Sequence, residues 1–409
     1  MSLYANSLHL MAANVLNAGF GFLFWMVAAR MYPAQAVGLT AAVISAVGLL
    51  AMLSLLGLDY AMIRFLPGAA DPEGIINSSL TIGIAMAVAA SLVFLFGLGL
   101  WSPALLPVRQ SPPLAAAFVA AAALTAASAL LASVYISRKQ TSMVLAHATV
   151  FGAGKVMLAA ALAAVSSTAG LLGAWALGLL AAVACGLVWF LPRVEEGHYR
   201  PRPTLRRAVL NDMTHFASAN YIAAALWGAP MLLLPLLIVN LVGPEANAYF
   251  YVAASVAGLV AMIPHAVSLS LFAHGSNDEG QLFRHTLGSA RFTLGLLVPA
   301  IAGVLLLGDK ILLLFGRAYS EQATGLLWIL ALATVPMTAN FLFFSVRRVQ
   351  QKMAGVVGST LCILVVTMGL SVLLLPRMGL LGAGLAWLAA QSSVALVLLA
   401  RLALNRRLM

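Results

Sequence analysis

A lysine inside a membrane-length apolar run is the residue with the clearest potential for chemistry. Lys155 stands near the middle of the run 143–165, directly after the small-residue string Phe151-Gly152-Ala153-Gly154. A cation at that depth costs roughly 2.5 to 3.5 kcal/mol on insertion scales, so it is expected to face protein or water and to have a neutralising partner. Near the middle of the other apolar runs we find no lysine or arginine.

The carboxylates offer no obvious partner for this lysine. All 11 Asp and Glu residues fall in loops or at the ends of apolar runs. We therefore interpret Lys155 as a candidate binding residue whose anion is brought in by a ligand. The alternative is that its side chain extends to the membrane surface, or donates to backbone carbonyls beside the neighbouring glycines.

Composition places the chain among integral membrane proteins. Hydrophobic residues make up 63% and charged residues 8%, against roughly 45 to 50% and 25% in soluble domains. The net charge of +11 does not indicate nucleic acid, because the basic residues lie between apolar runs, where they set topology and meet anionic headgroups. The 2 cysteines both lie inside apolar runs. We expect no disulfide framework, no metal site and no cofactor.

Runs of about 20 apolar residues predict an all-α polytopic membrane protein with twelve transmembrane helices in two six-helix bundles. The stretch 192–212, with three prolines and five arginines, separates the bundles and predicts domains at 1–205 and 206–409. We interpret this stretch as a solvated basic loop that meets anionic headgroups. The expected spans are 7–29, 36–57, 75–100, 113–136, 143–165, 169–191, 216–240, 246–272, 287–307, 323–345, 354–375 and 379–400.

The two halves are related by an internal repeat. The string SAVGLLAML at 45–53 resembles SVAGLVAMI at 255–263, and GLLGA occurs at both 170–174 and 379–383. The basic pair Arg138-Lys139 is matched by Arg347-Arg348 at nearly the same offset. Six helices return the chain to its starting side, so the repeat predicts a pseudo-two-fold axis along the membrane normal. By these offsets, Leu364 or Val365 takes the place of Lys155.

Basic residues also predict the orientation of the chain. Most of the 22 lysines and arginines lie in loops on the side that carries both termini. The positive-inside rule therefore predicts cytoplasmic termini. The first residues lack a basic segment, so the first apolar run is expected to be a retained helix.

Polar residues near the spans complete the candidate substrate-binding set. Asn14 and Asn17 lie in the first span, where they either bond to a neighbouring helix or line a cleft. Arg64 follows the second span, either paired with Asp59 or receiving an anionic headgroup, and Arg291 either binds or extends outward. The whole set is Lys155, Arg64, Arg291, Asn14, Asn17, Arg30 and Asn340.

Features of enzymes and nucleotide-binding proteins are missing from the sequence. Gly154-Lys155 lacks the upstream glycine of a phosphate-binding loop. His147, His215 and His265 show no metal-ligand spacing, and the loops on the outer side are too short for a catalytic domain. We therefore expect a protein that is not an enzyme.

The chain resembles the MOP flippase superfamily, and within it the polysaccharide-biosynthesis branch, the Wzx-type O-antigen and exopolysaccharide flippases. The resemblance rests on the two six-helix bundles, the phrase GLDYAMIR at 57–64 and the GLLGA that opens helices six and twelve. It implies an alternating-access transporter of the bacterial inner membrane, serving lipopolysaccharide or exopolysaccharide synthesis. Its cargo would be an undecaprenyl-diphosphate-linked oligosaccharide, moved from the cytoplasmic to the outer leaflet. Arg64 matches the arginine that commonly ends the second-helix motif.

Two related branches fit the sequence less well. The lipid II flippase MurJ typically has fourteen helices and several charges in its first helix, whereas this chain has no formal charge there before Arg30. MATE drug exporters have twelve helices, but many use a buried carboxylate, and none is evident here. A small-molecule exporter of the MATE type and a membrane glycan polymerase or ligase remain the alternatives.

The resulting hypothesis is that Lys155, helped by Arg64 and Arg291, attracts the diphosphate of a lipid-linked glycan. The expected partners are this lipid substrate, membrane lipids, and the polymerase and glycosyltransferases of the same process. Nucleic acid is not expected, and the protein is expected to be a monomer.

Overall fold

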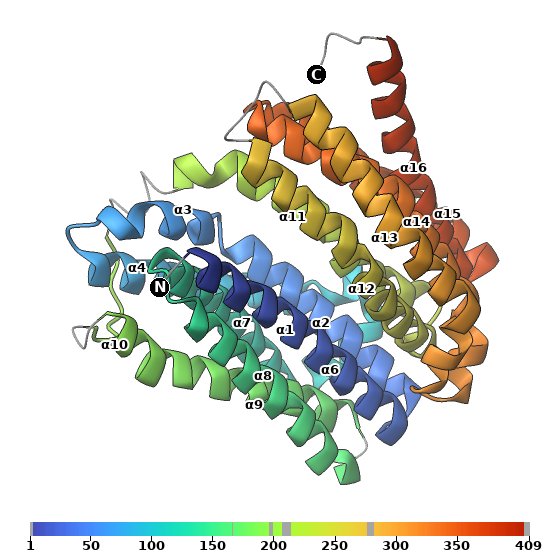
Figure 1. The fold of residues 1–409 in the computed structure, drawn as a ribbon. Coiled ribbons are helices and arrows are strands. Elements are labelled where there is room, and N and C mark those ends of the chain that lie inside the picture. The colour runs from blue at the N-terminus through green and yellow to red at the C-terminus, as the bar shows by residue number, and fades with distance from the viewer. Residues whose placement is uncertain (1–2, 166, 196–198, 207–213, 276–281, 405–409) are drawn as a thin grey trace. The chain divides into compact units, whose positions relative to one another are not determined.

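The protein is all-helical over the residues that its computed structural model describes, which are 3–165, 167–195, 199–206, 214–275 and 282–404. Within these ranges, twelve helices are long and apolar enough to cross a membrane. The chain divides into two compact units, Met1–Tyr221 and Ile222–Met409 (Figure 1). The predicted all-α architecture with twelve spans is confirmed. The domain boundary expected at residue 205 stays a prediction.

The first unit contains six long helices and several short ones. The long helices are α1 (Leu3–Met31), α2 (Ala34–Ser54), α4 (Pro72–Phe96), α7 (Pro112–Ser137), α8 (Thr141–Ala161) and α9 (Thr168–Cys185). The short segments are α3 (Leu58–Phe65), η1 (Leu66–Gly68), α5 (Leu98–Trp101), η2 (Pro103–Leu105), α6 (Leu106–Gln110), η3 (Ala163–Val165), the π-helical η4 (Gly186–Phe190) and α10 (Leu191–Val194).

The second unit is built from long helices, most of which carry an internal proline. They are α11 (Thr214–Leu241), of which the part up to Tyr221 belongs to the first unit, α12 (Pro244–Gly275), α13 (Leu282–Leu313), α14 (Arg317–Val349), α15 (Met353–Met378) and α16 (Leu380–Leu404). Proline removes a hydrogen bond from the helix interior and bends the helix. The prolines inside these helices are Pro230, Pro235, Pro264, Pro299, Pro336 and Pro376.

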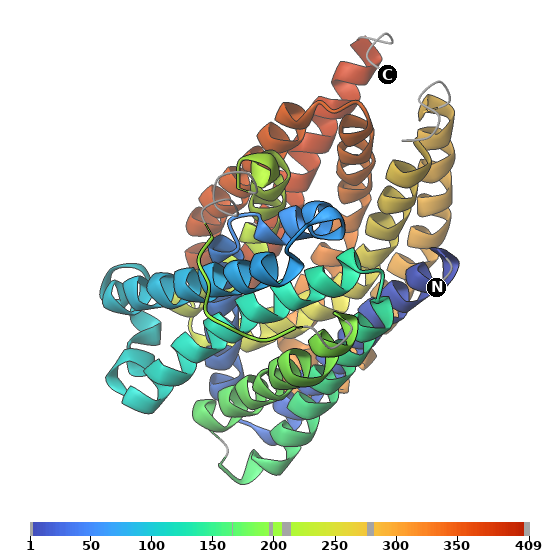
Figure 2. The same cartoon turned by 90° about the vertical axis from the view of Figure 1, so that its left-hand side faces the viewer.

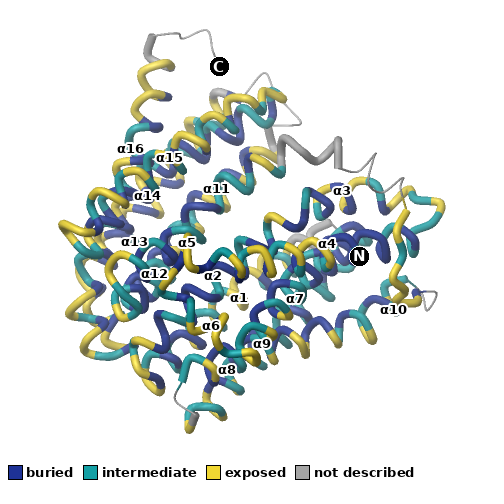
Figure 3. The backbone as a smooth tube through the Cα atoms, turned by 180° about the vertical axis from the view of Figure 1, so that it is seen from behind, coloured by how far each residue is buried: buried dark blue, intermediate teal, exposed yellow. Residues whose placement is uncertain are grey.

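The two units share part of their helix packing. The fourth long helix contacts the second, third and sixth, so that α7 packs on α2, α4 and α9, while α14 packs on α12, α13 and α16. The fifth and sixth helices pair as α8 with α9 and as α15 with α16. Buried and exposed residues alternate along the helices, because each helix packs on its neighbours with one face only (Figure 3). The repeated packing agrees with the repeat in the sequence.

The turn before the fifth helix of each unit shows which residues of the two units are equivalent. After α7, Lys139 has φ 57° and the Gln140 amide donates to the Tyr135 carbonyl at 2.8 Å. After α14, Gln351 has φ 56° and the Lys352 amide donates to the Arg347 carbonyl at 2.9 Å.

These equivalent turns change which residue of the second unit corresponds to Lys155. Lys155 lies 16 residues beyond Lys139, and the residue 16 beyond Gln351 is Thr367, not Leu364 or Val365. Thr367 is fully buried, and its hydroxyl has no hydrogen-bond partner among the described residues.

The second span ends earlier than predicted. The sequence suggests a helix to residue 57, but α2 ends at Ser54 and the chain turns through Leu56 at φ 50° and Gly57 at φ 82°. Glycine adopts this left-handed backbone without steric cost. Leu56 adopts it at a steric cost, because its Cβ crowds the following carbonyl oxygen. The Tyr221 hydroxyl donates to the carbonyls of Met52 and Leu53, at 2.9 and 3.1 Å. It thereby bonds two carbonyls of the last turn of α2, where helical acceptors lack their usual partners, although that of Met52 also accepts from the Leu55 amide at 3.3 Å.

Glycines let α8 approach both of its neighbours closely. A Cβ on Gly178 of α9 would lie 2.8 Å from the backbone nitrogen of Lys155, and a Cβ on Gly152 would overlap the ring of Phe20 on α1. Small residues at such crossings bring helix backbones together in membranes. The Tyr32 hydroxyl also donates to the Ala159 carbonyl at 2.8 Å. The position of Lys155 is therefore set by α1 and α9 as well as by its own helix.

We expect Gly178→Val to destabilise the first unit by about 1 to 3 kcal/mol, because the added side chain overlaps the backbone of α8. The matched control is Gly173→Val on the same helix, where a Cβ meets no atom within 4 Å. Thermal unfolding of both variants in nanodiscs measures the difference. Equal unfolding temperatures for the two variants would contradict the close crossing of α8 and α9.

Candidate functional site

Lys155 is buried in the interior of the first unit, with a relative exposure of 6%. Its ammonium nitrogen lies 4.5 Å from the ring centroid of Phe151 and 5.7 Å from that of Phe24 on α1. Phe151 in turn packs edge-on against Trp175 of α9, with centroids 5.8 Å apart. Aromatic faces attract a cation by about 0.5 to 2 kcal/mol each, most when the site is dry. We call Phe24, Phe151 and Trp175 the aromatic cage of Lys155.

Over the described part of the chain, Lys155 forms neither an ion pair nor a hydrogen bond. The ion pairs found there join Arg138 to Glu195, Arg206 to Asp71 and Arg317 to Glu321. The side chain is enclosed and does not extend to an exposed surface. The cation is therefore held by ring faces, which offset only part of its burial cost.

Sequence reasoning did not assign the aromatic cage, although part of it leaves a signal. Phe151 precedes Lys155 by four residues, which puts both on one face of α8. Phe24 comes from the first helix and Trp175 from the helix after α8, so their places in this site depend on tertiary packing.

The candidates on α1 lie on its exposed surface. Asn14, Asn17 and Arg30 are all exposed. Neither amide forms a hydrogen bond to another described residue, so the expected bond to a neighbouring helix is not seen. Their assignment to substrate binding stays a prediction.

Arg64 and Asp59 lie on the short helix α3 but do not pair with each other. Arg64 is exposed, with its guanidinium carbon 5.9 Å from the ring of Phe65. Asp59 is half-buried, and its Oδ1 is enclosed without a hydrogen-bond partner in the described structure. Burial raises the pKa of the Asp59 carboxyl. From the sequence we expected no buried carboxylate. The enclosed oxygen of Asp59, just after the break between α2 and α3, corrects that expectation.

The two candidates in the second unit occupy opposite environments. Arg291 is exposed on α13. Asn340 is fully buried on α14, and its amide nitrogen donates to the side-chain oxygen of Gln391 at 2.7 Å and to the Gln391 carbonyl at 3.1 Å. This amide joins α14 to α16 in the present conformation. A substrate contact for either residue stays a prediction.

The stretch expected to be a solvated loop is in part bound to α4. Asn77 accepts from the Tyr199 hydroxyl at 2.7 Å and donates to the Arg200 carbonyl at 2.9 Å. The Arg206 amide donates to Ser78 at 3.2 Å. Residues 199–206, the linker strap, thus cross the N-terminal part of α4 (Figure 2). These residues form a loop whose side chains are mostly exposed, as the prediction of a solvated loop has it, and part of its backbone is bonded to α4 because buried polar groups of that helix require partners.

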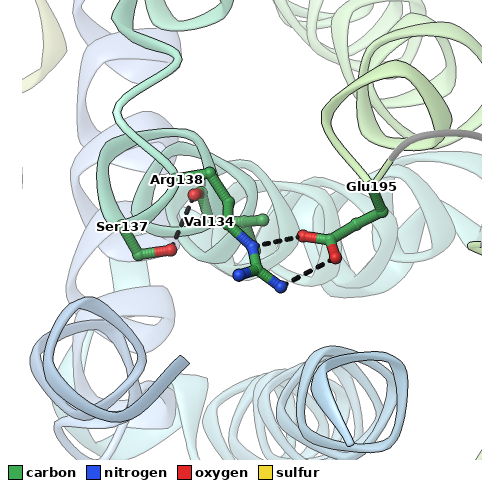
Figure 4. Close-up of polar contacts among 4 residues, drawn as sticks. All are labelled: Val134, Ser137, Arg138 and Glu195. Carbon is green, nitrogen blue, oxygen red and sulfur yellow. Dashed lines mark hydrogen bonds and ion pairs between the residues drawn. The ribbon is translucent and has the colours of Figure 1, made fainter. Parts of the chain in front are cut away.

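An ion pair holds the chain just before the linker strap. Arg138 donates two hydrogen bonds to Glu195, at 2.7 and 2.8 Å, in the fork geometry favoured by guanidinium and carboxylate (Figure 4).

Burial and the nearby charge of Glu73 raise the pKa of Tyr199 to about 12. The Tyr199 hydroxyl therefore stays protonated and remains a donor to Asn77 at neutral pH.

Comparison with solved structures defines the class of this fold. The structure is similar to an inward-facing multidrug resistance MATE family transporter of the MOP superfamily, with 14% identity, 96% of each chain covered and a TM-score of 0.74. It is equally similar to the lipid II flippase MurJ in an inward closed conformation, with 12% identity, 98% of this chain and 87% of that chain covered, and a TM-score of 0.74. A MOP superfamily transporter from Pyrococcus furiosus matches at 13% identity, with 98% and 94% covered and a TM-score of 0.62. The fold is that of the MOP superfamily.

A family model then identifies the branch. The model described as polysaccharide biosynthesis protein matches residues 27–324, and the chain belongs to this family. A search of curated proteins finds no match. The solved structures that share this fold are a transporter and a flippase.

We expect Asp59→Asn to change how stability depends on pH. Because burial raises the pKa of Asp59 above its ordinary value of 3.8, the folded protein binds this proton more tightly than the unfolded chain. The associated stability is full below pH 3.8 and is lost as the pH rises through the folded-state pKa. At a pH of about 7 the Asn variant should therefore unfold at a higher temperature than the wild type, and the gap should close toward a pH of about 4.

Thermal unfolding in nanodiscs over this pH range measures the effect. Asp71→Asn serves as the control, because Asp71 pairs with Arg206 and its replacement should not stabilise the protein at neutral pH. If Asp59→Asn and the wild type unfold together at every pH, the enclosed carboxyl oxygen has no energetic consequence.

Proposed function

We propose that the protein moves an anionic lipid-linked oligosaccharide, of the undecaprenyl-diphosphate class, from the cytoplasmic to the outer leaflet by alternating access. The observation that carries this proposal is the buried ammonium of Lys155, which has no carboxylate partner among the described residues. An anion arriving with the substrate would complete the electrostatics of this site.

The magnitudes favour an anionic cargo. A charge pair separated by about 4 Å is worth roughly 4 kcal/mol at an effective dielectric of 20, which is comparable to the cost of burying the cation alone. The same charge repels cationic drugs. With the cell interior negative, an anion moving outward gains about 2.3 kcal/mol per charge per 100 mV, so the membrane potential itself favours export.

Other candidate residues fit a path that leads to Lys155. Arg64 is exposed on α3, and we assign it to the diphosphate headgroup before the lysine receives it. Asn14, Asn17, Arg30 and Arg291 are exposed on α1 and α13 and would contact the glycan or the headgroup. We place the protein in the bacterial inner membrane with both termini in the cytoplasm. It would serve surface polysaccharide synthesis as a monomer, beside a polymerase and glycosyltransferases.

A MATE-type exporter of small molecules is the second candidate, because the structure matches a MATE transporter as well as it matches a flippase. Such an exporter would be expected to use a buried carboxylate to hold a cation. Asp59 is the residue to consider, but it lies on the short helix α3 and not inside a spanning helix. Drug resistance on expression would favour this alternative.

We expect Lys155→Met to lower flipping at least tenfold, because the apolar side chain keeps the packing and removes the charge that an anion requires. Proteoliposomes with a fluorescent undecaprenyl-diphosphate oligosaccharide and a membrane-impermeant quencher report the movement between leaflets. Lys155→Arg keeps the charge and should retain more activity than Lys155→Met.

Lys310→Met is the matched control, since Lys310 is exposed at the end of α13, and it should flip the lipid at the wild-type rate. Wild-type flipping by a folded, inserted Lys155→Met protein would remove the role of the lysine. A wild-type protein that flips no lipid-linked glycan and confers drug resistance would overturn the proposed function itself.

A further inference from the structure

A groove of about 570 Å³ lies between α12 and α13, two helices of the second unit that run side by side (Figure 1). On α12 it is lined by Ile263, Ala266, Val267 and Ser270, which recur at helical spacing. On α13 the lining residues run from Arg284 to Leu296 along one stripe of the helix. The proposed role of Lys155 does not involve this groove.

Small residues keep the groove open. Ala266 and Ser270 of α12 and Gly288 and Ser289 of α13 are among its lining residues. A Cβ built on Gly288 meets no atom within 4 Å. Larger side chains at these positions would fill the space between the two helices, so the groove follows from residue types on both of them.

The helix α14 covers another side of this pair. The buried Ser268 of α12 donates its hydroxyl hydrogen to the Phe341 carbonyl of α14 at 2.9 Å. Leu282, at the start of α13, is buried in a cluster with Leu342 and Val346 of α14. Both walls of the groove are therefore fixed by their packing on a third helix.

The groove is cationic at one end and apolar at the other. Arg284 and His285 line the cationic end, and no described carboxylate lines the groove. Arg284 is exposed and pairs with no carboxylate in the described ranges. At the other end, Phe292 and Leu296 leave 60% and 45% of their surface exposed. An anionic group and an apolar chain thus each have a defined end of the groove.

The cationic end lies at the boundary of the apolar spans. Arg284 is the first residue of the span Arg284–Leu313, and Ser270 precedes the end of the neighbouring span, Ala273, by one turn. Lipid headgroups begin at this level. Leu296 is 12 residues beyond Arg284, or about 18 Å along the helix axis, against about 15 Å for half of the hydrocarbon core. The groove therefore has the depth of one leaflet.

These features select an anionic phospholipid. Its phosphodiester is an acceptor for the guanidinium of Arg284 and the imidazole of His285, and the positive end of the α13 dipole lies at the same level. A zwitterionic headgroup would bring an ammonium group toward Arg284, which repels it. A lipid in transit must cross both leaflets, whereas this groove ends at the depth of one, so the matching occupant is a resident lipid.

We propose that the groove between α12 and α13 binds a resident anionic phospholipid, with the phosphate at Arg284 and His285 and an acyl chain along Phe292 and Leu296. The inference is independent of the proposed function, because it involves neither Lys155 nor the transported glycan.

Photolabelling in nanodiscs of phosphatidylcholine tests this site. The probe is a phosphatidylglycerol with a diazirine midway along one acyl chain, and mass spectrometry after irradiation should place its adducts within 263–270 and 284–296. Unlabelled phosphatidylglycerol should lower the labelling about fivefold more than an equal amount of phosphatidylethanolamine with the same chains, as one charge pair near the membrane surface predicts.

Variants locate the binding. Arg284→Gln should lower labelling about fivefold, whereas Arg401→Gln, which removes an exposed arginine from the last turn of α16, should label like the wild type. Gly288→Leu occupies part of the groove and should lower labelling about as much as Arg284→Gln. Its control is Gly295→Leu on the same helix, at a position outside the groove where a Cβ also meets no atom within 4 Å.

The outcomes separate this inference from its alternatives. Adducts outside the groove, equal competition by phosphatidylethanolamine, or unchanged labelling in Arg284→Gln and Gly288→Leu would overturn the site. If undecaprenyl phosphate displaces the probe better than phosphatidylglycerol does, the groove belongs to the transported lipid and the resident phospholipid is refuted. The expected labelling in a protein that flips no lipid-linked glycan would leave this inference standing while the proposed function fails.

Discussion

The structure depends on how a positive charge is kept in an apolar interior. Lys155 is enclosed by α1, α8 and α9, and ring faces are its nearest favourable neighbours. Cation–π contacts of about 0.5 to 2 kcal/mol each offset part of a burial cost of roughly 2.5 to 3.5 kcal/mol and leave the charge without a counter-ion. A site in this condition gains free energy from any anion that reaches it, and this is the electrostatic basis for proposing it as a binding site.

The surrounding packing keeps that cation where it is. Gly154 and Gly178 bring α8 and α9 together at the level of Lys155, and Gly152 accepts the ring of Phe20 from α1. Because the backbones are nearly in contact, the lysine cannot move outward without separating three helices. Elsewhere in the same unit, Asn77 holds the linker strap and Tyr221 holds the end of α2. The first unit thus fixes its polar segments to helices at several points.

Local and periodic properties of the sequence predicted most of the fold. Twelve apolar runs, the internal repeat and the depth of Lys155 follow from composition and spacing, and the structure agrees with them. The break at Leu56 and Gly57 was missed because the apolar run continues through it. The bonding partners of Asn77, and the Phe24 ring beside Lys155, lie more than a hundred residues away, and no local pattern reports such pairs. The sequence suggested that the side-chain amide of Asn340 binds substrate, but in the structure this amide donates a hydrogen bond to Gln391.

The turns at Lys139 and Gln351 make Thr367 the positional equivalent of Lys155. Codons for threonine and lysine can differ by a single base. A chain built from two copies of one helical unit can therefore gain or lose its internal charge in one mutational step, with the frame around it unchanged. The charge asymmetry of this molecule needs no remodelling of its architecture, and paralogues with the opposite assignment, a cation in the second copy and a hydroxyl in the first, would be equally accessible to evolution.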